Sequence, residues 1–577
     1  MFNRYYQEQL ALLKDLGAEF SKAHPALAPM LSGQTSDPDV ERLLEGTAFL
    51  TGLIRHKLDD EFPELLHGLM NHFFPHYLRP IPSSSILAFT PRQSLREQIT
   101  VPAGTEVAST PLDGTSCIFR TCFDIDVLPL RIKNAILEQP VGASPSISVT
   151  FEISGIPLAS WHPEKIRLYL SGGIPQGSDL YYHLINNTES VIFSSPEGEK
   201  CVLPPSVIKP VGFGESEPLL PYPSHAFPAY RIIQEYFMLP EKFLFVDITG
   251  FDKWQKRGSG SSFTVSFSLK EQDTEAPLQV KQDSFVLFAT PIVNLFEHDA
   301  DPIRYDHLKS RYLVRPSGAD PKQYQVVEVK SVSGFQQGSS RPRDYISFQQ
   351  FTPQYEANAV YNITKAKSLV DDSMETYISV AYPGVDNAPV EEVLSVRLLC
   401  TNGALPERLG LGDISRQTST SPEILEFSNI RQITMTIQPP LESHILWRLL
   451  SHLSVNAHSL ARPDALKALL DLYLFTDGRD RTTILANKKR IAGIQGVSTE
   501  YINRLSRGNM LRGVSVNLSM NMENFAGVGD MCLFSAILDR FLGWTSAVNS
   551  FTSLSVTEAN TGEIYRWPAR LGEHFLI

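Results

Sequence analysis

The residues best suited to chemistry in this chain are three closely spaced histidines, a run of acids and five cysteines. His67, His72 and His76 lie within ten residues of one another, and imidazoles can bind zinc when they share one face of a helix. Pro75 stands between His72 and His76 and is expected to end the helix there. Since no carboxylate or thiol is in register with them, we interpret the histidines as polar positions at a helix end.

The acids Asp59, Asp60 and Glu61 form the densest carboxylate cluster. Glycoside hydrolysis needs two carboxylates across a cleft, one of them with a raised pKa. Three consecutive acids at a helix end are more typical of a solvated face, or of a surface that pairs with arginines of a partner. We therefore predict no catalytic role for them.

The cysteines and the common catalytic motifs also indicate no site. Only Cys117 and Cys122 are close, as C-x4-C, and no second pair completes a zinc site. The wide spacing predicts reduced, partly buried thiols. The sequence contains no H-E-x-x-H, no G-x-S-x-G and no phosphate-binding loop. We predict no catalytic, cofactor-binding or metal-binding residues.

Size and charge restrict the class of protein. A chain of 577 residues exceeds a single hydrophobic core, which stops growing near ~300 residues. Acidic residues number 63 and basic residues 51, and this net charge of −12 disfavours binding to nucleic acid. The densest apolar segment, Ser284 to Phe296, falls short of the ~18 residues that cross a bilayer. We expect a soluble protein with no direct membrane insertion.

Residues 1–82 are predicted to be helical. Apolar residues recur at steps of four and three, as in a heptad seam, and Gly17 falls within it; they are Tyr6, Leu10, Leu13 and Phe20. A second helix is predicted to begin at Asp37 and Pro38, with a wide apolar stripe that includes Leu43, Leu50 and Ile54. Burial within the chain's own core and packing on partner helices both explain these patterns, and the patterns alone favour the former.

The remaining chain is predicted to be β-rich and then mixed. Alternating residues predict strands with one wet face at 149–153, 166–170, 263–269 and 433–437. In the last of these we expect Ile433, Met435 and Ile437 inward and Thr434 and Thr436 outward. Helices near 446–453, 463–474 and 534–541 flank a strand at 514–522.

We therefore predict a multi-domain α+β fold. Its segments are a helical, bundle-forming segment 1–82, β-rich sandwich-like modules at 83–290 and 291–440, and an α+β domain at 441–577.

Five long blocks of sequence keep their order along nearly the whole chain. They are RYYQEQLALLKDLGAEF with residues 37–83, GFGESEPLLPYPSHAFPAYRIIQEYFMLPEKFLFVDITG, TPIVNLFEHDADPIRYD, LLCTNGALPERL, and a C-terminal set that includes RGVSVNLSM. These blocks resemble the TssF family, the baseplate subunits of the type VI secretion system.

The resemblance implies a cytoplasmic structural protein of a contractile, phage tail-like injection system, similar to wedge proteins of phage baseplates. It implies that two TssF copies combine with one TssG. TssK binds the same wedge and links it to the inner-membrane complex, so that the protein is recruited to the cytoplasmic face of that membrane. TssE joins the wedge, and the sheath grows from the plate around the spike and tube. The family has no cofactor and no reaction.

With this resemblance, packing on partner helices becomes the preferred interpretation of the N-terminal patterns. The predicted interface consists of Tyr6, Leu10, Leu13, Phe20, Leu43, Leu50 and Ile54. The alternative is a cell-wall-active hydrolase or a binding module of a phage-like tail, whose site would be assembled from residues distant in sequence.

Overall fold

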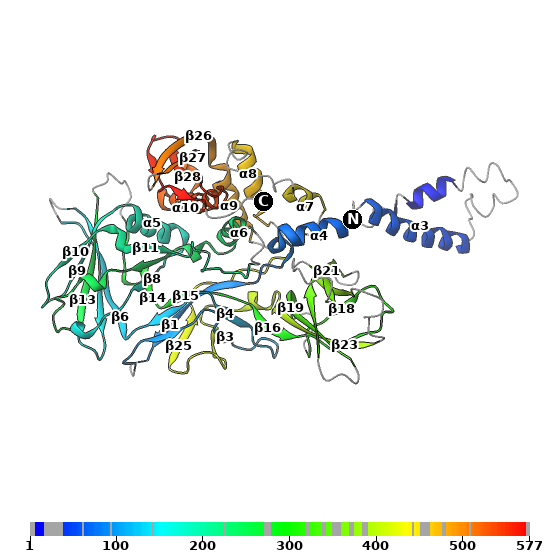
Figure 1. Cartoon of the computed structure of the whole chain (residues 1–577), viewed down its shortest axis with the longest axis horizontal. Helices are drawn as coiled ribbons and strands as arrows, with labels where there is room; N and C mark the ends of the chain where they lie inside the picture. The colour runs from blue at the N-terminus through cyan, green and yellow to red at the C-terminus, as the bar shows by residue number, and fades with distance from the viewer. Residues whose placement is uncertain are drawn as a thin grey trace. The chain divides into compact units, whose positions relative to one another are not determined.

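The computed structural model describes most of the chain. The described residues are 6–7, 9–16, 38–59, 63–92, 95–140, 144–222, 227–270, 278–318, 323–336, 342–348, 359–368, 374–382, 391–440, 443–450, 462–475, 480–506 and 509–572. They form two compact units, one of residues 1–70 with 441–450 and one of residues 71–440 with 451–577. The fold is α+β with several sheets, as predicted (Figure 1).

The first unit is helical. Its described elements are the helical residues 6–7 and 9–16, α3 (Pro38–Asp59), most of α4 (Pro63–Phe73) and α7 (Ser443–Leu450). Prolines suit the first position of α3 and α4, because a helix leaves that backbone N–H unpaired. Asp39 and Glu41 in the first turn of α3 complement the positive end of the helix dipole. None of the described helices combines the length and apolarity needed to span a membrane.

A six-stranded sheet lies at the centre of the second unit (Figure 1). Its order is β24 (Ile414–Gln417), β3 (Glu106–Ser109), β4 (Ile118–Thr121), β15 (Ala289–Val293), β1 (Ser84–Pro91) and β25 (Leu425–Asn429). Strands that are more than 300 residues apart in sequence thus pair directly, as Leu87 does with Asn429. Beside it, β2 (Ile99–Val101) pairs with β5 (Ile125–Val127).

Two further antiparallel sheets use the predicted alternating strands. One has the order β10 (Cys201–Leu203), β9 (Thr188–Ser194), β13 (Ser262–Leu269), β7 (Ser146–Ile153) and β6 (Leu130–Glu138). The other has the order β11 (Ile208–Val211), β12 (Phe245–Ile248), β8 (Ile166–Leu170) and β14 (Phe285–Leu287). Every second residue of β13 is buried, and its Phe263 stacks on Phe151 of β7. The predictions for 149–153 and 263–269 are confirmed. Residues 166–170 form the predicted strand but lack the predicted wet face, since Tyr169 is buried.

An eight-stranded sheet encloses its own hydrophobic core. Its order is β16 (Phe296–Asp299), β23 (Glu392–Thr401), β19 (Gln325–Phe335), β20 (Arg343–Ser347), β21 (Val360–Lys367), β22 (Met374–Ala381) and β18 (Tyr312–Val314), with β17 (Ile303–Tyr305) beside β23. Leu394, Val396 and Leu398 alternate along β23 and lie in this core.

The C-terminal region alternates helices and strands, as predicted. It consists of α8 (Pro463–Leu472), α9 (Arg481–Ala492), β26 (Ile494–Ser506), β27 (Asn509–Met520), α10 (Val528–Trp544), β28 (Phe551–Glu558), β29 (Ile564–Arg566) and β30 (Arg570–Leu571). β27 and β28 pair in parallel, with α10 as the crossover between them. α10 also packs on α5 (Gly173–Asn186) and α6 (Ala229–Met238), so this region is joined to the β-rich part.

The prediction for residues 433–437 is wrong. The segment forms no strand beyond an isolated bridge at Ile437. Ile437 is buried as predicted, but two positions are reversed, since Thr436 is buried and Met435 is exposed. The Thr436 hydroxyl lies 2.9 Å from that of Ser83 and donates to the carbonyl of Gly403 at 2.6 Å. These hydrogen bonds, to residues distant in sequence, outweigh the local apolar alternation.

His76 lies at the centre of an aromatic core in the second unit. The short 3-10 helix η1 (Pro75–Leu78) places its ring near-parallel to those of Tyr230 and Tyr473. The Tyr222 hydroxyl donates to the carbonyl of Phe227, so His76 Nδ1 donates to the Tyr222 oxygen at 3.0 Å and Nε2 accepts from Tyr473 at 3.1 Å. Burial, with the nearby Arg79 charge, lowers the pKa of His76 to about 3. The ring is therefore neutral at pH 7. His76 does lie at a helix end, as predicted, but its ring is buried in the aromatic core.

We expect His76 to make the protein sensitive to acid. Its folded pKa lies below the ordinary 6.5, so its contribution is complete above pH 6.5 and is lost as the pH falls toward 3. The loss amounts to roughly 4 kcal/mol near pH 3. In denaturant titrations, His76→Gln should be less stable at pH 7 and should show a flatter pH dependence between pH 6.5 and 5. Equal pH slopes for the two proteins would contradict this role.

We also expect Gly529 to be required for the contact between α10 and α5. A Cβ at this position would collide with the backbone of Ser178 and Asp179. Gly529→Ala should destabilise the fold by about 1–3 kcal/mol. The control is Gly46→Ala, a helix position with open space, which should be neutral or stabilising by about 1 kcal/mol. Chemical unfolding of both variants measures the difference, and equal stabilities would disprove the close-packing argument.

Candidate partner-binding surface

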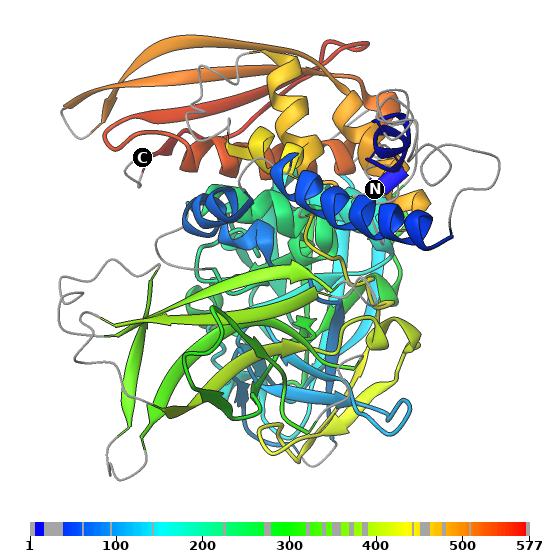
Figure 2. The same cartoon turned by 90° about the vertical axis from the view of Figure 1, so that its right-hand side faces the viewer.

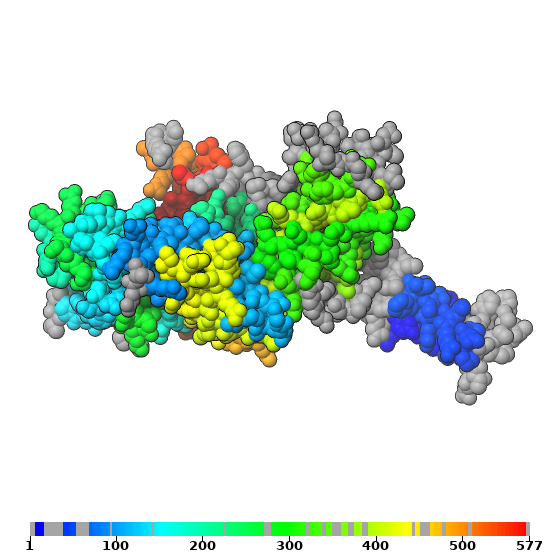
Figure 3. All heavy atoms as spheres, turned by 90° about the horizontal axis from the view of Figure 1, so that it is seen from below, coloured from blue at the N-terminus to red at the C-terminus, as the bar shows by residue number. Residues whose placement is uncertain are grey.

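The candidate surface lies on the N-terminal arm, by which we mean the described residues 6–16 and α3. Leu43 and Leu50 on α3 are 72% and 61% exposed. They are seven residues apart, or about two helical turns, and so share one face. In the space-filling view, side chains of α3 (blue) lie at the surface (Figure 3). Such exposure of large apolar side chains is typical of a surface that another protein covers.

The other predicted interface residues have different surroundings. Tyr6, Leu10 and Leu13 are half-buried. The first helix and α3 approach each other where Lys14 Nζ lies 3.7 Å from the Glu41 carboxylate. Phe20 lies outside the described residues, as does the side chain of Ile54 within α3.

Sequence reasoning missed three exposed apolar residues of the arm as interface candidates: Leu12, Leu16 and Phe49. Leu12 and Leu16 are one turn apart and share a face of the first helix. The signal that could have found them was present, because both widen the apolar side of the heptad seam. Chemically, the arm offers apolar area for burial against another helix.

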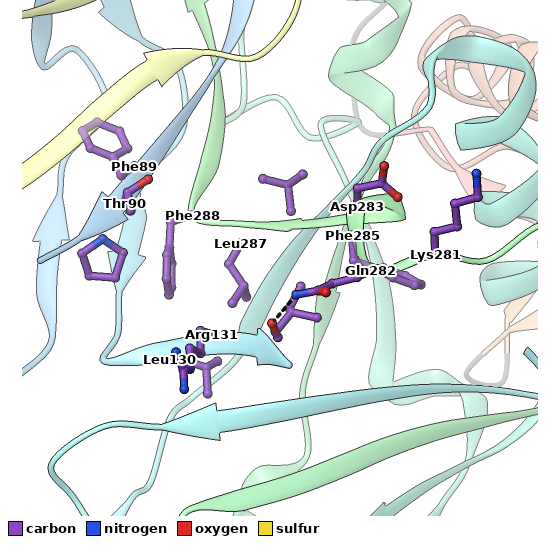
Figure 4. A pocket seen from close by; sticks show the side chains of 13 residues that line it. Phe89, Thr90, Leu130, Arg131, Lys281, Gln282, Asp283, Phe285, Leu287 and Phe288 are labelled. Atoms are coloured by element: carbon purple, nitrogen blue, oxygen red, sulfur yellow. Dashed lines mark hydrogen bonds between the residues drawn. The ribbon is translucent and has the colours of Figure 1, made fainter. Parts of the chain in front are cut away.

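An open groove of about 610 Å³ lies in the described part of the second unit (Figure 4). Its walls are mostly apolar, with Phe285, Leu287 and Phe288 on one side and Leu130 on the other. Gln282 Nε2 donates to the carbonyl of Ile132 at 2.9 Å. Among the thirteen lining residues Asp283 is the one acid and no histidine is present, so neither a two-carboxylate nor a histidine mechanism can be built from the lining.

The clustered histidines and acids of the sequence form no site among the residues that the structure describes. His72 is exposed, and His76 uses both ring nitrogens on tyrosines. The side chains of His67 and Asp59, together with Asp60 and Glu61, lie outside the described residues. No group of three metal-ligating side chains occurs among the residues described.

The five cysteines are free thiols, as predicted, and four of them are buried. Burial raises the pKa of Cys117 to about 11 and those of Cys122 and Cys400 to about 12. A thiol with a raised pKa stays protonated at pH 7 and is a poor nucleophile.

The blocks of sequence that suggested a family meet in the interior at the joints between sheets. Asn294, which lies between β15 and β16, is fully buried. Its Oδ1 accepts from Thr401 Oγ1 at 2.6 Å and from the Asn402 backbone at 2.7 Å, and its Nδ2 donates to the Ile118 carbonyl at 2.7 Å. This asparagine thus joins the six-stranded sheet to the eight-stranded one. These residues stabilise the joint between the two sheets.

Comparison with known proteins agrees with this description. A family model described as "Type VI secretion system, TssF" matches residues 1–574. The chain is 29% identical over 615 residues to the type VI secretion system component TssF1 of Pseudomonas aeruginosa, and the match covers 98% of each protein.

Two solved structures are similar over nearly the full length. A chain in the cryo-electron microscopy structure of a type VI secretion TssK–TssF–TssG baseplate subcomplex superposes with a TM-score of 0.78 at 30% identity, over 92% of this chain and 98% of that one. A chain of the type VI secretion baseplate complex superposes with a TM-score of 0.67 at 27% identity, over the whole of both chains. The chain therefore belongs to the TssF family of the type VI secretion system.

Proposed function

We propose that this chain is a structural subunit of a baseplate wedge and that it acts by assembly and not by catalysis. Family membership and the likeness to chains of solved baseplate complexes support this role. The observation on this chain that carries the proposal is the exposed apolar face of the arm, with Leu43 and Leu50 on the same side of α3.

The energetics of that face favour a helical partner. Fully burying one leucine side chain contributes roughly 1.5–3 kcal/mol, so two leucines supply about 3–6 kcal/mol before the entropic cost of association. A helix that presents apolar residues every seven positions matches a helix that does the same. We propose that the predicted interface, Tyr6 through Ile54, contributes to an intermolecular helical bundle.

We propose the partners that the family resemblance implies, of which TssK and TssG accompany TssF in a solved relative. A TssG-type protein and a second copy of this chain form the bundle, with two copies of this chain to one TssG. TssK- and TssE-type proteins join the same wedge. The finished plate then starts sheath and tube assembly around the spike at the cytoplasmic face of the inner membrane, next to the inner-membrane complex. Two copies that meet one asymmetric partner must bind it in non-equivalent ways.

We keep the division into segments 1–82, 83–290, 291–440 and 441–577 as a working proposal. Limited proteolysis of the assembled wedge, followed by mass measurement of the fragments, would locate the exposed boundaries.

One prediction of this proposal concerns the stoichiometry of the complex. Co-expressed with its own TssG-type protein, this chain should purify as a complex whose native mass corresponds to two copies and one partner. Native mass spectrometry measures this directly. A one-to-one complex would contradict the two-to-one wedge. Failure of the chain to bind the TssG-type protein would contradict the proposed function itself.

The second prediction concerns the arm. The double variant Leu43→Asp, Leu50→Asp should weaken the complex at least 100-fold, because charged groups would then enter the apolar contact. Both side chains are exposed in the free chain, so its thermal midpoint should stay unchanged. Leu308→Asp is the matched control, since Leu308 is exposed but belongs to the second unit. A complex that forms as tightly with the double variant as with the control would exclude this face of α3 from the interface.

A further inference from the structure

The hairpin formed by β26 and β27 runs past the rest of its sheet. Its pairing continues outward as far as Ser506 with Asn509, whereas β28 pairs with β27 only from Val514 to Met520. In Figure 2 the two orange strands extend beyond the helices beneath them. The outer part is therefore a two-stranded ribbon, a structure that is marginally stable in water unless one face is covered.

One face of this ribbon carries three exposed apolar side chains. Leu505 pairs with Met510 and Tyr501 pairs with Val514, and we call Tyr501, Leu505 and Met510 the hairpin strip. Leu505 is 68% exposed and Met510 69%. The opposite face carries the exposed Glu500 and Arg504 together with Ile502 and Leu511, which are half-buried. The strip therefore differs from that face in that its large apolar side chains are exposed.

The strip continues a face that this chain covers with its own helices. The same row of cross-strand pairs includes Val516 and Leu518, which are buried. Helices α8 and α9 pack on β26, and α10 packs on β28. The same sheet face therefore changes from helix-covered to open near Val514.

The length and charge of the strip indicate which kind of protein segment could bind to it. Tyr501 and Leu505 are four residues apart, about 13 Å along a strand, which equals roughly two and a half turns of helix. Arg512 lies on the same face opposite Asn503, and its guanidinium stands 4.5 Å over the Tyr501 ring. In the described part of the chain Arg512 makes no ion pair with a carboxylate, so an acid on the occupant would complement it.

We infer that the hairpin strip docks an amphipathic helix of another protein, with apolar residues against Leu505 and Met510 and an acidic residue beside Arg512. This surface is separate from the arm and goes beyond the proposed bundle. It rests on the proposed function only in placing the docking event within the assembled secretion machine.

Site-specific photo-cross-linking in cells that produce the complete machine tests the inference. A benzoylphenylalanine in place of Leu505 should cross-link to one partner segment. Mass spectrometry of the adduct should place that segment in a helix with apolar residues three or four apart and an acid one turn away. The matched control carries the same group in place of the neighbouring Arg504, on the opposite face, and should not give this adduct.

A second variant keeps the test independent of the cross-linker. Leu505→Glu with Met510→Glu should reduce contraction-dependent secretion at least tenfold while the chain's thermal midpoint is unchanged, and Arg512→Glu should act in the same direction. The inference is overturned by identical adducts from positions 504 and 505, by no adduct at 505, by an adduct to an extended segment paired along β26, or by normal secretion with the glutamates. In each of these cases an intact two-to-one wedge would still support the proposed function.

Discussion

A buried carboxylate, Glu235, fixes the segment on which the second unit is built. Its side chain is fully inaccessible, and leaving such a charge unpaired would cost several kcal/mol. It forms an ion pair with the equally buried Lys242 and accepts the backbone N–H of Leu219 at 2.7 Å. One turn earlier in the same helix, Arg231 donates to the carbonyl of Gly214 at 2.9 Å. The loop before α6, α6 itself and the turn after it therefore form one body, and α10 packs on that body.

The other joints of the second unit follow the same principle. Asn294 and His76 are buried polar side chains whose hydrogen-bonding groups are taken up by partners far away in sequence. A satisfied buried polar group specifies one arrangement of the elements around it, because any other arrangement leaves it unpaired. Such groups are unavailable for acid–base or metal chemistry. Asn294, His76 and Glu235 all lie in blocks that carry the family resemblance, and each helps to fix how neighbouring elements join.

Local patterns in the sequence predicted local structure well. The alternation at 263–269 reappears as β13, because burial of one face is enough to specify a strand. The helical spacing at 534–541 reappears as α10, which is buried on nearly all sides. The predictions that failed concerned residues whose orientation depends on contacts with residues distant in sequence. Thr436 is turned inward by Ser83, 353 residues away, and no periodicity in residues 433–437 carries that information. The composition of the six-stranded sheet was unpredictable for the same reason. At the candidate surface, the pattern identified apolar helix faces but could not show which leucines remain exposed.

The two exposed apolar surfaces, on the arm and on the hairpin strip, differ in how stable their conformation is in the unbound chain. The arm is helical, and its backbone hydrogen bonds are internal to each helix. Leu43 and Leu50 therefore stay on one face of α3 without a neighbouring strand to hold them there. The outer hairpin has only one ladder of hydrogen bonds, between β26 and β27, and no third strand beside it in the described region. Its opening free energy is therefore lower than that of the sheet beneath. A partner helix would gain less net affinity at the hairpin, because part of the contact energy must offset ordering of the ribbon. This difference favours an order of assembly in which the arm binds first and the hairpin is secured afterwards.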